Sequence, residues 1–537
     1  MIEVFPSQRR GRRAPVRVIP TLALGSTLCL LSACPGPTTL VLELAPAGVD
    51  PTAVGGRLTL SVFAVSSGKT VAETELASKT PAAQRRIFSA LELVAGEVYQ
   101  LRLRARFDEP VCLNDQPELD RRAVGVSAPF VYQSSLERVA LYVGCADGTR
   151  AMGNPELRLF HSATWVPQGA MQGRVWLTGG VAPATAVLDF DDATETRPLR
   201  SIESFDPISG QFAPVAAELS RPRFLHSAAL RGDGELVLSG GIEKIGEGDD
   251  AEFAFVRTVE RLRGGRIERM PDLREGRGAH GQAIAGTNQI AVFGGLGADP
   301  DGFGVRALDS VELFDASGTL PSASSKLAAP ASAPTVIPLG DDRHVLVVGG
   351  SGQPQVDERN ELFCLAAPCD CGDPPCARPL NGFGVGRGRI GVAGAFVPCQ
   401  GGGGAVYVAG GSTEVPGAPT DTSHSDIYCL DTKRPVQLER VGALLRQRSL
   451  HTMTVVAGPQ GPRLFVAGGG GPLTDTPSTA ELIQVDCACG AIAAEAIQQV
   501  ALRGARAGHT ATPLPDGTVL LVGSLVGAAA ERFSPER

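Results

Sequence analysis

Five of the seven histidines in this chain occur in one recurring context, Arg-x-x-His, followed by a short apolar segment that ends in Gly-Gly or a close variant. The pairs are Arg158/His161, Arg223/His226, Arg277/His280, Arg448/His451 and Arg506/His509. A scarce residue used so regularly belongs to a repeat rather than to a single active site. The repeat therefore limits what the C-terminal two-thirds of the chain can fold into.

The second glycine of each pair, or its equivalent, marks a period of 54 to 61 residues. The markers are Gly180, Gly241, Gly295, Gly350, Gly411, Gly469 and Ser524. An apolar, largely β-branched run precedes each marker, which is typical of a strand buried between two layers. A second apolar segment lies before that run, and Asp233-Gly234 and Asp516-Gly517 separate the two segments in two repeats. Asp-Gly between two strands is a strong hairpin signal.

A third segment follows each marker after a loop of variable length, and it opens with an acidic residue. These residues are Glu203, Glu260, Glu312, Glu361, Asp426, Glu481 and Glu531. A fourth, weaker segment leads to the next arginine. Four short strands per period, repeated seven times, predict an all-β fold with a seven-bladed β-propeller over residues 149–537.

The pattern Arg-x-x-His, turn, strand, Gly-Gly, loop and Glu resembles kelch repeats, closest to those in the propeller domain of galactose oxidase. The resemblance covers roughly residues 150–537 and is weak in the fourth strand, where Phe212 and Ile267 stand in for the usual tryptophan. Repeat four lacks Arg-x-x-His, and repeat five reads Arg387-Gly-Arg-Ile. The copper site of galactose oxidase has no matching motif here, so the resemblance implies the fold and not that chemistry.

The chain ends a few residues into the third strand of repeat seven, so no fourth strand follows. We expect the segment just before Arg158 to supply the outer strand of the last blade. Closing the ring in this way would remove an open strand edge.

Residues 1–33 have the pattern of a lipoprotein signal peptide, with five arginines before an apolar run. Leu31-Ser32-Ala33-Cys34 resembles a lipobox, which predicts lipidation of Cys34; an ordinary signal peptide with an incidental cysteine is the alternative. The expected location is the cell envelope, anchored by the lipid alone, at the outer membrane. Residues 34–148 alternate polar and apolar residues in short runs, which predicts a small Ig-like β-sandwich.

The whole chain has a formal net charge of −8, and removing the arginine-rich first 33 residues makes it more acidic. No basic patch interleaved with aromatic residues remains, so nucleic acid is not an expected partner. In an exported protein, cysteines normally form disulfides. The candidates are Cys112 with Cys145, and the group Cys364, Cys369, Cys371 and Cys376. A metal site is the alternative for that group, but its spacing matches no zinc motif.

We interpret the Arg-x-x-His units as structural, because a catalytic centre uses one constellation and these recur around a ring. The loops after three Gly-Gly markers are acidic and are expected on the same face of the propeller. Their residues are Asp191, Asp192, Asp249, Asp250, Asp299 and Asp301. They could bind Ca²⁺ or a cationic ligand, although solvated acidic loops are the plainer interpretation, and no cofactor or resident metal is expected.

These observations favour a monomeric binding protein that recognises a protein or a glycan through one propeller face. The alternative is a carbohydrate-modifying enzyme of the oxidase or epimerase type, with its site at the mouth of the central channel. Unequal, convergent polar residues at that mouth would distinguish the enzyme. The sequence names no catalytic residue and no ligand.

Overall fold

The computed structural model describes most of the chain after residue 37. The described ranges are 38–46, 48–49, 55–77, 85–91, 93–112, 121–133, 136–169, 171–182, 196–286, 288–301, 304–314, 325–350, 360–380, 389–413, 423–435, 437–470 and 478–536. Within them the regular structure is β-strand, with short 3-10 turns such as Gly248–Asp250. No helix within these ranges has the length and apolar character needed to span a bilayer.

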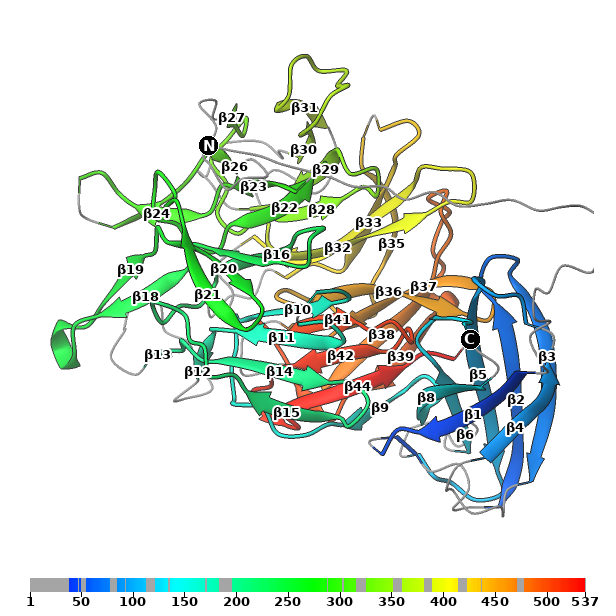
Figure 1. The fold of residues 1–537 in the computed structure, drawn as a ribbon. Helices are drawn as coiled ribbons and strands as arrows, with labels where there is room; N and C mark the ends of the chain where they lie inside the picture. The colour runs from blue at the N-terminus through cyan, green and yellow to red at the C-terminus, as the bar shows by residue number, and fades with distance from the viewer. Residues whose placement is uncertain are drawn as a thin grey trace, which may run out of the picture.

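Seven four-stranded antiparallel sheets form the propeller, and we number these blades 1 to 7 in chain order (Figure 1). Blades 1 to 3 are β10 (Ser162–Val166), β11 (Arg174–Thr178), β14 (Ile202–Asp206) and β15 (Gln211–Pro214); β16 (Ser227–Leu230), β17 (Leu236–Ser239), β20 (Val259–Arg263) and β21 (Arg266–Met270); and β22 (Gly281–Ala285), β23 (Gln289–Phe293), β26 (Ser310–Phe314) and β27 (Ser325–Lys326). Blades 4 and 5 are β28 (Thr335–Pro338), β29 (His344–Val348), β30 (Asn360–Cys364) and β31 (Cys376–Leu380); and β32 (Ile390–Pro398), β33 (Gly404–Ser412), β34 (Asp426–Asp431) and β35 (Glu439–Ala443). Blades 6 and 7 are β36 (Thr452–Gly458), β37 (Gly461–Ala467), β38 (Thr479–Gln484) and β39 (Ile497–Ala501); and β41 (Thr510–Pro513), β42 (Val519–Val522), β44 (Ala530–Ser534) and β9 (Gly148–Ala151). The predicted seven-bladed architecture is therefore confirmed.

The ring closes as expected from the sequence. The innermost strands contact one another in order around the ring, and the last of them, β41, contacts β10. In blade 7 the outer strand β9 comes from the segment before Arg158 and pairs antiparallel with β44, Phe533 lying opposite Thr149. The predicted closure by a strand from the N-terminal side of the propeller is confirmed.

Antiparallel pairing assigns every connection to one of two faces. The motif face is the one where the Arg-x-x-His segments, the Gly-Gly pairs and the loops after these pairs lie. The turn face is the opposite one, where the turns between first and second strands and between third and fourth strands lie. These two names are kept below.

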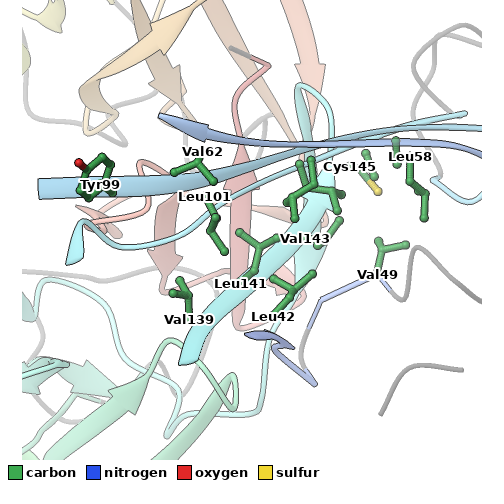
Figure 2. Close-up of a cluster of buried hydrophobic side chains, with 14 of the residues drawn as sticks. Leu42, Val49, Leu58, Val62, Tyr99, Leu101, Val139, Leu141, Val143 and Cys145 are labelled. Atoms are coloured by element: carbon green, nitrogen blue, oxygen red, sulfur yellow. The ribbon is translucent and has the colours of Figure 1, made fainter. Parts of the chain in front are cut away.

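Residues before the propeller form one eight-stranded sheet. Its strands are β1 (Thr38–Leu44), β2 (Gly56–Ala64), β3 (Lys69–Ala77), β4 (Arg85–Leu91), β5 (Val98–Phe107), β6 (Arg122–Val126), β7 (Phe130–Val131) and β8 (Leu136–Cys145). The order is β3-β2-β5-β6-β8-β1-β4, and β7 pairs with β5. Leu58 and Leu101, from the neighbouring strands β2 and β5, share one buried core with Leu141 and Leu42, from the neighbouring strands β8 and β1, so the sheet folds around this core as a sandwich does (Figure 2). The strand pairs of this sheet are antiparallel except for β1 and β8, which pair parallel.

Buried polar contacts join this sheet to the propeller. Asp147, between β8 and β9, receives two hydrogen bonds from the Arg463 guanidinium, at 2.9 and 2.8 Å. Burial raises the pKa of Asp147, and Arg463 opposes that shift. The guanidinium of Arg532 lies over the ring of Tyr142, 3.6 Å from its centroid. Charges and rings from both parts therefore meet in one buried junction.

Candidate binding face

Each arginine of the repeat ties together the strands of its own blade. Arg223 is completely buried and donates to the carbonyl of Gly240 at 2.9 Å and to the Glu260 carboxylate at 2.7 Å. Glu260 opens the third strand, as the acidic residue of the repeat does in each blade. The equivalent ion pairs are Arg158–Glu203, Arg277–Glu312, Arg448–Glu481 and Arg506–Glu531. Burial lowers the pKa of Arg223, whereas Glu260 acts in the opposite direction.

Four of the five motif histidines, His161, His226, His280 and His509, instead contact a hydroxyl of the preceding blade. His226 Nε2 lies 3.0 Å from Thr178 Oγ1 in blade 1, and His280 Nε2 lies 2.9 Å from Ser239 Oγ in blade 2. Burial, with the charges of Arg223 and Arg158, lowers the pKa of His226 to about 3. The imidazoles are therefore neutral and enclosed between blades. The structural role of the Arg-x-x-His units stays a prediction.

Repeats four and five depart from the motif in a way that the sequence pattern obscured. The arginine of blade 5 is Arg389 rather than Arg387, since the Gly350 amide donates to the carbonyl of Arg389 at 2.6 Å. Arg389 also lies 3.5 Å from Asp426, the acidic residue that opens the third strand. Val392 then occupies the position of the histidine.

The Gly-Gly pairs make backbone hydrogen bonds between neighbouring blades. Gly180 donates its amide to the carbonyl of Arg223 at 2.8 Å, and the equivalent bond occurs at Gly241 and Arg277 at 2.7 Å. Both glycines of the first pair have positive φ, 55° at Gly179 and 101° at Gly180. A Cβ on Gly179 would lie 2.6 Å from the Arg223 carbonyl oxygen. Glycine is needed there for both reasons.

A ring of left-handed residues that sequence reasoning missed surrounds the propeller axis at the motif face. In each blade the residue just before the histidine position has positive φ; these residues are Phe160, Leu225, Ala279, Ala333, Gly391, Leu450 and Gly508. At six junctions its amide donates to the matching carbonyl of the preceding blade, for example from Leu225 to Phe160 at 2.9 Å. Only Gly391 and Gly508 hint at this conformation in the sequence, because apolar residues with positive φ are rare.

Among the described residues, four blades carry a two-stranded pairing on the motif face, near the Gly-Gly position. These are β12/β13 (Val181–Ala182, Arg197–Pro198), β18/β19 (Ile242–Ile245, Glu252–Phe255), β24/β25 (Leu296–Ala298, Val305–Ala307) and β40/β43 (Gly504–Ala505, Val526–Gly527). The first three belong to blades 1 to 3, and neighbouring hairpins contact each other through β13 with β18 and β19 with β24. Together these three form a continuous wall, which we call the hairpin wall (Figure 1).

Apolar side chains fill the base of the hairpin wall. Leu159, Val181, Phe224 and Ile242 are buried in one cluster. Partly buried residues from the ring, the hairpins and blade 7 pack against it; they are Phe160, Leu225, Phe253, Phe255 and Leu525. The wall therefore rests on an apolar layer near the axis.

Ion pairs fix each hairpin of the wall to the linker that enters its own blade. The linker residue lies two positions before the motif arginine in all three cases. The pairs are Glu156 with Arg197 at 3.3 Å, Arg221 with Glu243 at 2.7 Å, and Glu275 with Arg306. In blade 2 the linker residue is the arginine and the hairpin residue is the glutamate, whereas in blades 1 and 3 the linker residue is the glutamate. The ion pair is therefore present in all three blades although the residue types are exchanged.

The acidic loop residues do not gather into one group in the part of the chain that is described. Asp191 and Asp192 lie outside the described residues, as does the side chain of Asp249. Asp250 lies in the tip of the β18/β19 hairpin, and Asp299 accepts a hydrogen bond from the Asp301 amide at 3.3 Å. The described residues contain no cluster of three or more His, Cys, Asp or Glu side chains able to hold a metal ion. Calcium binding stays the less favoured alternative for these loops.

The ten cysteines of the described residues form five disulfides. They are Cys112–Cys145, Cys364–Cys369, Cys371–Cys376, Cys399–Cys487 and Cys429–Cys489. The first lies in the N-terminal sheet domain, the next two in the loop between the third and fourth strands of blade 4, and the last two between blades 5 and 6. Apart from Cys112–Cys145, they lie toward the turn face, away from the hairpin wall. Their number indicates an extracellular or envelope protein.

No protein-family model and no curated protein sequence matches this chain. Among solved structures, the chain is similar to one described as the structure of YjhT, with 12% sequence identity and a TM-score of 0.44. That match covers 65% of this chain and 98% of the other. The assignment of a seven-bladed propeller rests on the strand pairing described above.

Proposed function

We propose that this protein binds a protein partner on the motif face, with the hairpin wall of blades 1 to 3 as the principal contact. The distribution of exposed apolar side chains supports this. In the described part of the propeller, the exposed large apolar residues of the motif face are Leu157, Ile245, Val305, Leu445 and Val526, whereas the turn face has Ile208. An apolar surface that is concentrated on one face and rimmed by charges is typical of a protein interface.

The wall is suited to recognition because it is held in place before a partner arrives. Its hairpins contact one another, rest on the apolar layer around Phe224 and are fixed by the linker ion pairs. A preorganised surface loses less conformational entropy on association. The aliphatic character of Ile245 and Val305 favours a protein over a glycan.

The test compares a doubly substituted wall variant with a turn-face variant that carries one charged substitution at a similarly exposed residue. Ile245 is 45% exposed on the wall and Ile208 is 52% exposed on the turn face. The immobilised chain would capture partners from envelope extract of the source cells, with crosslinking and mass spectrometry to identify them. Ile245→Asp with Val305→Asp should lower capture of the same partner at least tenfold, and Ile208→Asp should leave it unchanged. Equal capture by all three proteins would contradict the proposal.

We also propose that the chain is a lipid-anchored envelope protein whose repeats are of the kelch, galactose oxidase-like type. The five disulfides support an oxidising compartment. The arginine, the Gly-Gly pair and the acidic residue recur at similar spacing around the ring, which supports the kelch assignment. Cys34, the proposed lipid attachment site, lies outside the described residues.

The anchor is tested by Cys34→Ser in cells that export the protein. The wild type should fractionate with the outer membrane and incorporate a labelled fatty acid, whereas the variant should be released to the soluble fraction. A membrane-bound, unlabelled variant would place the anchor elsewhere in the chain.

A further inference from the structure

The junction between blades 5 and 6 lacks the side-chain hydrogen bond that its histidine would make. In four other junctions a hydroxyl of the preceding blade contacts the histidine Nε2; these hydroxyls belong to Thr178, Ser239, Thr452 and Thr510. They come from two positions, just before the Gly-Gly pair or just after the preceding histidine. In blade 5 those positions are Ala409 and Ala393, and neither ring nitrogen of His451 has a hydrogen-bond partner.

This arrangement leaves both ring nitrogens of His451 without a hydrogen-bond partner, whereas at the other four motif histidines only Nδ1 has none. His451 is 6% exposed, and burial together with the charge of Arg448 lowers its pKa to about 3. An unmade hydrogen bond costs more than replacing both partners by apolar groups. The histidine position holds Pro334 in blade 4 and Val392 in blade 5, so no imidazole needs a partner at those two positions. The junction of blades 5 and 6 has kept the histidine and lost its partner.

The same junction carries the two disulfides that connect different blades. Cys399, after β32 of blade 5, is bonded to Cys487 after β38 of blade 6. Cys429, in β34 of blade 5, is bonded to Cys489 of blade 6. Both lie toward the turn face, whereas His451 lies at the motif face. Covalent bonds therefore hold one end of the junction, whereas the other end lacks the histidine hydrogen bond and has the weaker one from Ser423 Oγ to Ser449 Oγ at 3.3 Å.

We infer that the junction of blades 5 and 6 is a redox-sensitive seam, closed by Cys399–Cys487 and Cys429–Cys489 and loosened before the rest of the ring when they are reduced. Each disulfide would accept two electrons and two protons from a dithiol reductant, giving two thiols while the dithiol closes to its own disulfide. The reduced junction keeps its packing and bonds such as Tyr407 Oη to the Asp486 carbonyl at 2.9 Å. It no longer has a covalent connection to offset the unsatisfied His451. The inference is independent of the proposed partner binding.

Hydrogen exchange measured by mass spectrometry on the folded full chain, with and without dithiothreitol, tests the seam. After reduction, amide exchange should rise at least tenfold in β32, β33, β36 and β37, with little change in blades 1 to 3. Because dithiothreitol can reduce all five disulfides, a quadruple variant with Cys399, Cys429, Cys487 and Cys489 replaced by serine is compared with Cys371→Ser/Cys376→Ser. The latter pair spans five residues of one loop in blade 4 and serves as the control.

A rescue experiment separates the seam from general loss of stability. Ala409→Ser places a hydroxyl where Ser239 contacts His280 in blade 2. In the reduced chain, Ala409→Ser should slow amide exchange in β36 and β37 at least threefold, toward the rate of the oxidised chain. Ala467→Ser, at the same position in blade 6, should not slow it. Uniform exchange over all blades after reduction, an equal effect of the control pair, or failure of Ala409→Ser to slow exchange would each overturn the inference. If the quadruple variant does not fold, reduction of the folded wild type still decides the question.

Discussion

The repeat pattern predicts only part of what single residues contribute to this propeller. The recurrence of the five Arg-x-x-His units predicts that they stabilise the fold. The structure pairs the buried Arg223 with the buried Glu260. The sequence does not show that the arginine contacts strands of its own blade, whereas the histidine lies against the preceding blade. The left-handed conformation of Leu225 had no signal in the sequence, because leucine normally avoids positive φ.

The buried histidines should make stability depend on pH. The pKa of His226 is about 3 in the folded chain and about 6.5 when unfolded, so the unfolded state binds its proton first. The free energy of unfolding is therefore expected to fall as pH drops from about 6.5 toward 3, by up to about 1.4 kcal/mol per pH unit for each such histidine. Denaturation curves of His226→Gln should show a smaller slope between pH 6.5 and 5 than those of the wild type. Identical slopes would show that His226 is not enclosed.

His226 and His451 should also differ in what they contribute. Replacing His226 by alanine removes the hydrogen bond to Thr178, whose buried hydroxyl then has only the contact with Ser162 Oγ, and this should cost about 1–3 kcal/mol of unfolding free energy. His451 has no such bond to lose. Urea denaturation of His451→Ala should therefore show a smaller loss than that of His226→Ala, and the reverse order would contradict the assigned contacts.

At the scale of elements, the repeat predicted the blade strands and the closing position of β9 because apolar runs and turn residues recur there. It could not predict the hairpin wall, since β12/β13, β18/β19 and β24/β25 follow loops of variable length with no shared motif. The exposed residues Ile245 and Val305 are separated by 60 positions in sequence and are brought to one face only by the curvature of the ring. Contacts between neighbouring hairpins depend on that three-dimensional arrangement.

The Gly-Gly turns offer a direct measure of blade-to-blade packing. A Cβ on Gly240 would overlap the carbonyl oxygen of Arg277 and lie 2.7 Å from His280 Cε1, whereas a Cβ on Gly265 would meet nothing within 4 Å. Both glycines have positive φ, 58° and 77°. Gly265→Ala should cost about 1–2 kcal/mol for the left-handed backbone, and Gly240→Ala should cost more because blade 3 must shift. Equal losses in thermal and urea denaturation would mean that the blades do not pack through this turn.

At the scale of the whole molecule, the buried pair of Asp147 and Arg463 joins the N-terminal sheet to the propeller. Replacing Asp147 by asparagine leaves the buried guanidinium without its counter-charge, which should cost about 3–5 kcal/mol. The exposed pair of Glu43 and Arg138 provides the control, and Glu43→Gln should cost less than about 1 kcal/mol. Denaturation curves with equal, small losses for both variants would contradict a tightly joined pair of domains.

The central claim is that the molecule is a closed ring that presents its hairpin wall to a protein partner. Hydrogen-exchange footprinting of the full chain with the partner captured in the binding experiment tests it most directly. We predict new protection in β18/β19, β24/β25 and the ring around Phe160, with unchanged exchange in the turns at residues 207–210 and 264–265. New protection confined to the turn face or to the N-terminal sheet would contradict the account.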